Sequence, residues 1–107
     1  MEEIFECPIG GSIKLNLNVK PIDGLALARY EWQIKLYTSP NKVLIMHKKE
    51  CVKVDEDNYK VAFNSANVGI GNLKYVLTAS VPDGDFPDGI RIEPVKGELP
   101  VKIIPEL

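Results

Sequence analysis

Hydrophobic and polar residues alternate one by one along much of this chain. Residues 12–20 read S-I-K-L-N-L-N-V-K, so that every second side chain is apolar. A period of two is typical of an antiparallel strand that turns one face to a core and the other to water. Residues 30–38 repeat the pattern. Residues 42–48, which follow a Ser39-Pro40-Asn41 turn, are predicted to form its hairpin partner.

The second half of the chain continues in the same way. Further strands are expected at residues 51–55, 59–63, 72–81, 90–93 and 99–104. Residues 64–71 break the alternation and predict a loop with room for one helical turn. Apolar residues nowhere recur at helical spacing over three turns, so no long helix is expected. Seven or eight short strands separated by turns predict an all-β fold, an immunoglobulin-like antiparallel β-sandwich.

Trp32 lies in an early predicted strand, where immunoglobulin-like sandwiches carry a core tryptophan. The cysteine pair of true immunoglobulin domains is absent from the corresponding strands. Cys7 and Cys51 are the two cysteines of the chain, and without a signal peptide we expect them to stay reduced. The length of 107 residues suits one domain, predicted to span residues 1–107.

Composition and charge exclude several classes of partner. The hydrophobic share is 45% and the charged share 26%, which are ordinary globular values. The 13 basic and 15 acidic residues are spread over the chain, and no basic run exceeds residues 47–49. We therefore expect no binding to nucleic acid or to an anionic membrane surface. The acidic N-terminus and the absence of a long apolar stretch predict a soluble protein that is made in the cytoplasm without a signal peptide.

The turn-rich segment 82–89, P-D-G-D-F-P-D-G, is a candidate metal site. Asp83, Asp85 and Asp88 offer carboxylate oxygens, the ligands that Ca²⁺ prefers, but their spacing does not fit the EF-hand loop. The alternative is a tight double turn in which the aspartates accept hydrogen bonds from backbone N–H groups. The second interpretation is favoured, so neither a metal nor another cofactor is expected.

Motifs for catalysis are missing from the sequence. His47 is the one histidine, and no G-x-S-x-G motif occurs. Paired carboxylates such as Glu56-Asp57 lie in polar turns, where no apolar wall would raise a pKa for acid catalysis. We therefore expect a protein without enzymatic activity.

Two apolar features are candidate contacts with other protein chains. Val43, Leu44, Ile45 and Met46 form a predicted strand that is apolar on both faces. A sheet edge of this kind must be covered, or it pairs with another chain. Phe86 lies between aspartates at a predicted loop tip, where it either contacts a partner or covers the open end of the sandwich.

Two stretches resemble a family of short β-sandwich proteins of phages and prophages, which includes the N-terminal domain of baseplate upper proteins. One is G-x-x-I-x-L-x-L-x-V at residues 10–19, and the other is V-P-D-G-D-F-P-D-G-I-R-I-E at residues 81–93. The resemblance implies an immunoglobulin-like domain that takes part in tail or baseplate assembly, without a cofactor or a catalytic residue.

The residues and the resemblance together predict a non-catalytic structural, assembly or adaptor domain of a phage or prophage virion. Its expected partners are other protein chains, including further copies of itself. The alternative is a bacterial surface module that binds a glycan or calcium through the loop of Asp83, Asp85 and Asp88.

Overall fold

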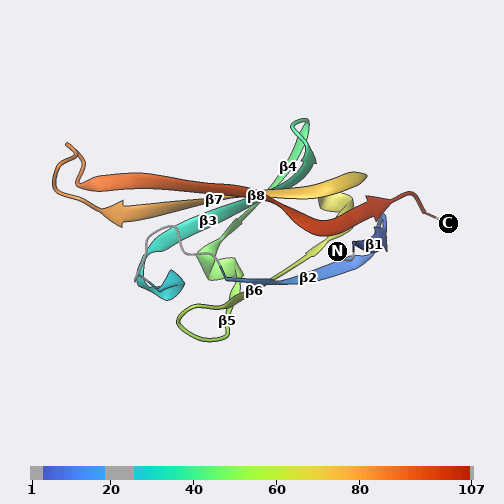
Figure 1. Ribbon diagram of the computed structural model, residues 1–107, viewed down its shortest axis with the longest axis horizontal. Helices are drawn as coiled ribbons and strands as arrows, with labels where there is room; N and C mark the ends of the chain where they lie inside the picture. Colours follow the sequence, from blue (N-terminus) through green and yellow to red (C-terminus); the bar gives the residue numbers. More distant parts are fainter. Residues whose placement is uncertain (1–3, 19–25, 107) are drawn as a thin grey trace.

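Eight strands and three short 3-10 turns make up the computed structural model, which describes residues 4–18 and 26–106. The strands are β1 (Phe5–Pro8), β2 (Ser12–Leu17), β3 (Glu31–Ser39), β4 (Lys42–His47), β5 (Val52–Lys53), β6 (Tyr59–Asn64), β7 (Gly71–Pro82) and β8 (Ile90–Ile104) (Figure 1). The 3-10 turns are η1 (Leu27–Arg29), η2 (Lys48–Glu50) and η3 (Ser65–Asn67). Within the described residues, no helix has the length and hydropathy needed to cross a membrane.

The strand order is that of an immunoglobulin-like sandwich. One sheet has the order β1-β8-β7-β3-β4, and the other has the order β2-β6-β5. With β2 to β8 taken as strands B, C, C′, D, E, F and G, the sheets contain G-F-C-C′ and B-E-D, as in immunoglobulin domains. The predicted all-β sandwich is therefore confirmed. One pair departs from the antiparallel pattern, because β1 runs parallel to β8.

The core forms between the sheets from the apolar positions of the alternating strands. Ile13 and Leu17 of β2 are buried, and so are Trp32, Ile34 and Leu36 of β3. Across the core, the Trp32 ring meets the ring of Tyr59 edge to face, with 5.1 Å between the ring centroids. The indole N–H donates to the carbonyl oxygen of Leu27 at 3.1 Å, so the polar atom of this tryptophan is satisfied inside the core.

Ser65 in η3 is a buried polar residue that links η3, at the end of β6, to the turn between β1 and β2. Its hydroxyl accepts a hydrogen bond from the Gly10 amide at 2.9 Å and donates to the Pro8 carbonyl oxygen at 3.2 Å. Its own amide donates to the carbonyl oxygen of Gly11 at 2.8 Å. These bonds fix η3 against the turn that joins β1 to β2. The loop predicted at residues 64–71 therefore contains the expected helical turn.

Several predicted boundaries were wrong. The sequence did not indicate β1, and the two short strands predicted at residues 90–93 and 99–104 are parts of the single 15-residue strand β8. β5 has two residues, shorter than the predicted 51–55. Val19, which the alternation assigns to the core face of β2, lies outside the described residues.

Candidate protein-binding surfaces

Among the residues that the structure describes, β4 is the last strand of the five-stranded sheet and pairs with β3 alone. Leu44 and Met46 point inward and pack against the core, while Val43 and Ile45 lie on the outer face with 42% and 44% of their surface exposed. The alternation arises because a strand turns successive side chains to opposite faces. The predicted apolar strand at these four residues is thus a sheet edge in the described structure.

Little in the described residues protects this edge. Natural edge strands are blunted by lysine, proline or a bulge, or are covered by another element. In β4 the basic residues Lys42 and His47 occupy the two ends, and the four central residues are apolar. Lys42 reaches out of the strand and donates to the carbonyl oxygen of Ala66 in η3 at 2.7 Å. The centre of β4 therefore presents its free backbone groups beside exposed apolar side chains.

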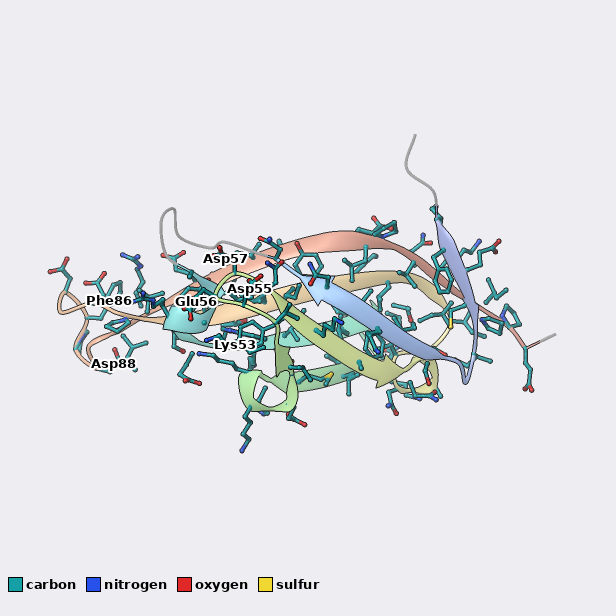
Figure 2. All side chains as sticks on the ribbon, turned by 90° about the horizontal axis from the view of Figure 1, so that it is seen from below. Lys53, Asp55, Glu56, Asp57, Phe86 and Asp88 are labelled. Atoms are coloured by element: carbon teal, nitrogen blue, oxygen red, sulfur yellow. The ribbon has the colours of Figure 1, made fainter. Side chains whose placement is uncertain are left out.

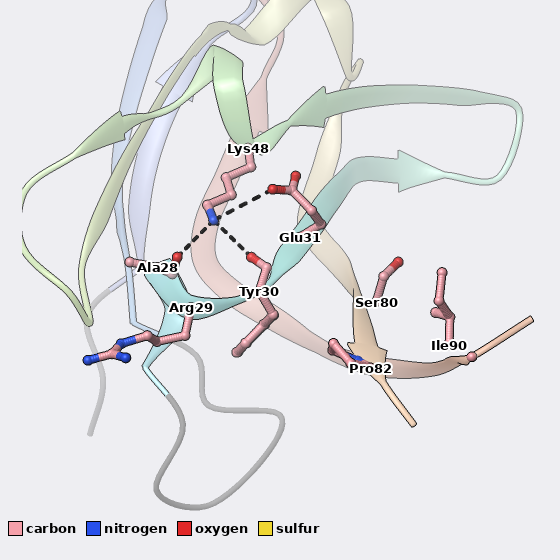
Figure 3. A pocket seen from close by; sticks show the side chains of 9 residues that line it. Ala28, Arg29, Tyr30, Glu31, Lys48, Ser80, Pro82 and Ile90 are labelled. Carbon is pink, nitrogen blue, oxygen red and sulfur yellow. Dashed lines mark hydrogen bonds and ion pairs between the residues drawn. The ribbon is translucent and has the colours of Figure 1, made fainter. Parts of the chain in front are cut away.

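Lys48 fixes the end of β4 next to the start of β3. Its ammonium group donates to the carbonyl oxygens of Ala28 and Tyr30, both at 2.9 Å, and lies 4.0 Å from the Glu31 carboxylate (Figure 3). These residues line an open hollow of about 400 Å³, which extends to Ile90 of β8. Because the ammonium group is held by carbonyl oxygens, it serves as a structural anchor for the corner.

Tyr30 lies beside this corner with its side chain buried. Among the described residues its hydroxyl has no hydrogen-bond partner. Burial raises the pKa of Tyr30 to about 12, so the phenol stays protonated at neutral pH. It is not an acid or base for chemistry near pH 7.

The β7–β8 hairpin projects beyond the body of the sandwich as an arm, visible at the left of Figure 1. The molecule measures 52 × 29 × 28 Å, and the arm lies along its longest axis. Phe86, Ile90 and Ile92 expose 44%, 41% and 56% of their surface on this arm and border a shallow hollow. Figure 2 places Phe86 at the tip of the arm, away from the sandwich, so it does not cover the end of the core.

The opposite face of the arm carries an ion-paired network. Arg91 donates from Nη1 to Oδ2 of Asp83 at 2.9 Å, and its Nε lies 2.7 Å from Oε1 of Glu93 as an ion pair without hydrogen-bond geometry. Val81, the cross-strand partner of Arg91, is buried, whereas Ile92 is opposite Ser80 on the outer face. The network joins β8 to the tip loop and holds the arm in one shape.

The aspartates of the tip loop cap its turns. Oδ1 of Asp83 accepts a hydrogen bond from the amide of Asp85 at 3.0 Å, and Oδ1 of Asp88 accepts one from the amide of Ile90 at 3.1 Å. Gly89 follows with φ +74°, which a glycine adopts without strain. No group of three acidic, histidine or cysteine side chains within residues 4–18 and 26–106 is placed to hold a metal ion. This geometry gives the calcium alternative no support.

A second acidic loop, between β5 and β6, is built from side chains that bond to one another. Asn58 donates to both carboxylate oxygens of Asp55, at 2.8 and 3.1 Å, and accepts hydrogen bonds from the side-chain amides of Asn16 and Asn18. The bond from Asn58 is the main reason that the pKa of Asp55 is lowered. The loop is therefore an ordered turn fixed to β2.

The two thiols and the histidine do not form a nucleophilic centre. Both cysteines are free, and Cys7 is buried in the core. The Cys51 thiol donates to the backbone oxygen of His47 at 3.5 Å. Burial, together with the charge of Glu50, raises the pKa of Cys51 to about 11, so that little reactive thiolate exists at neutral pH.

Sequence reasoning found the residues of β4 and Phe86, but the structure places them on separate surfaces, one at the sheet edge and one at the arm tip. The sequence predicts only an ordinary short strand at residues 90–93, so it does not identify Ile90 and Ile92 as surface residues of an arm. The sequence feature that could have revealed the arm is the length of the two strands beside the tip loop, β7 and β8. Strands that are longer than the other strands of a sandwich must extend beyond it.

The class that these features define is an immunoglobulin-like β-sandwich with an open apolar edge and a projecting arm. Comparison with known proteins adds no closer relationship. No family model, no curated protein and no solved structure matches this chain.

Proposed function

We propose that this chain is a non-catalytic assembly or adaptor domain that binds other protein chains through the β4 edge, with the β7–β8 arm as a second contact. The observation that carries the proposal is the exposed centre of β4. Its backbone groups and the side chains of Val43 and Ile45 have no neighbouring strand among the described residues. Addition of a strand from a partner would satisfy the backbone and cover the side chains in one step.

The chemistry of the polar residues supports binding over catalysis. Lys48 is held by carbonyl oxygens, Cys51 keeps its proton, and the carboxylates of Asp83 and Asp88 cap turns. Each group therefore serves the fold. Val43 and Ile45 of β4 have no such task, and exposed apolar side chains that are grouped on a sheet edge suit a protein-binding site.

The narrower form of the proposal is that the assembled structure is a phage or prophage tail or baseplate. It rests on the resemblance of residues 10–19 and 81–93 to that family. Mass spectrometry of particles purified from the host after prophage induction tests it. The chain should be present in stoichiometric amounts in tails. Its absence from the particles would contradict the role in a phage tail or baseplate but not the broader proposal that the chain is an assembly domain.

Site-specific photocrosslinking in the native host tests the broader proposal. A photoreactive phenylalanine analogue is introduced at Ile45, at Phe86, and at Lys60 as a control on the exposed side of β6. Discrete protein adducts are expected at Ile45, with or without adducts at Phe86, and none at Lys60. If neither Ile45 nor Phe86 gives an adduct with any protein, the chain is not an assembly domain of this kind.

A further inference from the structure

We propose that the open edge of β2 binds an extended segment of another protein, in which apolar side chains alternate with acidic ones. The segment would take the place of strand A, which lies beside strand B in immunoglobulin domains. In this chain β2 corresponds to strand B, and β6 is its one neighbour among the described strands. β1, which precedes it, pairs with β8 of the other sheet instead. This surface is separate from β4 and from the arm, so the inference goes beyond the proposed function.

The backbone of β2 presents hydrogen-bonding groups along this edge. The carbonyl oxygen of Gly11 accepts a hydrogen bond from the amide of Ser65, which marks the register of β2 against β6. Neighbouring residues of an antiparallel strand turn their backbone groups to opposite sides. The groups of Ser12, Lys14 and Asn16 therefore point away from β6, and none of them has a partner in the part of the chain that the structure describes. An added strand would satisfy them.

A hollow of about 180 Å³ opens beside this edge and reaches the core between the two sheets. Its lining includes Ile34 and Val61, each 1% exposed. It also includes Leu15 of β2 and Leu99 of β8, which are only partly buried. Since a cavity of about 150 Å³ holds one benzene molecule, the hollow is large enough for one apolar side chain of a bound segment.

Leu15 and Phe5 are inward-facing side chains that lack a cover. Leu15 alternates with Ile13 and Leu17, which are buried at the same face of β2, yet it stays partly exposed. Phe5 pairs in register with the buried Val101 and is still 60% exposed. Both line a second hollow of about 380 Å³, which meets the first one at Leu15. An extended segment with apolar side chains at alternate positions would cover both residues.

The charges of this sheet favour an acidic partner over a second copy of the chain. β2, β5 and β6 contain three lysines and no acidic residue. Lys53 is paired with Glu56 of the following loop, whereas Lys14 has no acidic partner among the described residues. A lysine on an edge strand hinders pairing with a like-charged copy of that edge. An aspartate or glutamate opposite Lys14 would instead stabilise the added strand.

Amide hydrogen exchange within β2 tests the inference with a synthetic peptide, T-V-E-L-E-V-T, blocked at both ends. In the chain alone, the amides of Lys14 and Asn16 should exchange fast, because they point to the open side. Those of Ile13 and Leu15 turn to β6 and serve as protected internal controls. Exchange in the complex requires release of the peptide. Peptide at about 1 mM, with a Kd of about 100 µM, should therefore slow the Lys14 and Asn16 amides about tenfold.

Charge reversal provides the matched controls. A peptide with lysine in place of both glutamates should bind at least about fivefold more weakly, and Lys14→Glu should reverse the order of the two peptides. Lys96→Glu makes the same change of charge at an exposed position of β8 in the other sheet and should leave the order unchanged.

Three results would overturn the inference. The first is that neither peptide slows exchange of the Lys14 and Asn16 amides. The second is that the two peptides act equally, or that Lys14→Glu leaves their order as it was. The third is that both amides are already protected without peptide, because the edge would then be covered by the chain itself or by a second copy.

Discussion

Replacement of Ser65 by alanine should destabilise the fold by about 2 kcal/mol. The hydroxyl makes two hydrogen bonds, one from the Gly10 amide and one to the Pro8 carbonyl oxygen, and Ser65 is fully buried. Each such bond contributes about 0.5–1.5 kcal/mol, and a buried group left without its partner adds its own desolvation cost. In a domain of this size, 2 kcal/mol corresponds to a fall in Tm of roughly 10 °C.

Urea unfolding followed by tryptophan fluorescence measures this change, because Trp32 lies in the core. Ser12→Ala is the control, since Ser12 is exposed at the start of β2 and its hydroxyl makes no hydrogen bond within the described residues. The control should change the free energy of unfolding by less than about 0.5 kcal/mol. Equal effects of the two substitutions would refute the reasoning that Ser65 links η3 to the β1–β2 turn.

Three further predictions concern the corner and the arm. The phenol of Tyr30 has a pKa near 10 in the unfolded chain and of about 12 in the folded chain. The free energy of unfolding should therefore fall as the pH rises from about 10 to 12. Tyr30→Phe should lessen this loss and, without an unpartnered hydroxyl, change stability at pH 7 by less than about 1 kcal/mol; a large destabilisation at pH 7 would be evidence for a hydroxyl partner. Cys51, with a pKa of about 11, should be alkylated at pH 8 about 100-fold more slowly than an ordinary cysteine, and an ordinary rate would contradict its burial. Arg91→Met should speed amide exchange across residues 83–93 while global stability changes by about 1 kcal/mol or less; unchanged exchange would show that the ion pairs do not order the arm.

The alternating strands could be predicted from the sequence because the period of two follows directly from strand geometry. β1 could not, since Cys7 is its one buried residue and its partner, β8, lies at the other end of the chain. The unbroken course of β8 was also hidden, because Pro94 and Gly97 indicate a break. Pro94 is tolerated because, among the described strands, β8 has β7 as its only neighbour at that point. The ring of Tyr75 covers Gly97 so closely that a Cβ there would lie 3.0 Å from it.

The candidate surfaces were predictable in composition but not in position. The apolar run from Val43 to Met46 indicates a strand with two apolar faces, which suits a central strand as well as an edge. The strand order alone decides that β4 is the last of its sheet. Ile92 illustrates the same limit, since its exposure follows from the extension of the β7–β8 hairpin beyond the sandwich.

Amide hydrogen exchange of residues 42–47, with and without clarified extract of the native host, tests most directly whether the β4 edge binds another protein chain. Exchange across β4 should slow in the presence of the extract, while β5 at the edge of the other sheet should not change. Ile45→Lys, which introduces a charge at an exposed position, should abolish this slowing while the core remains protected. Exchange of β4 that is equally fast with and without the extract would contradict the account.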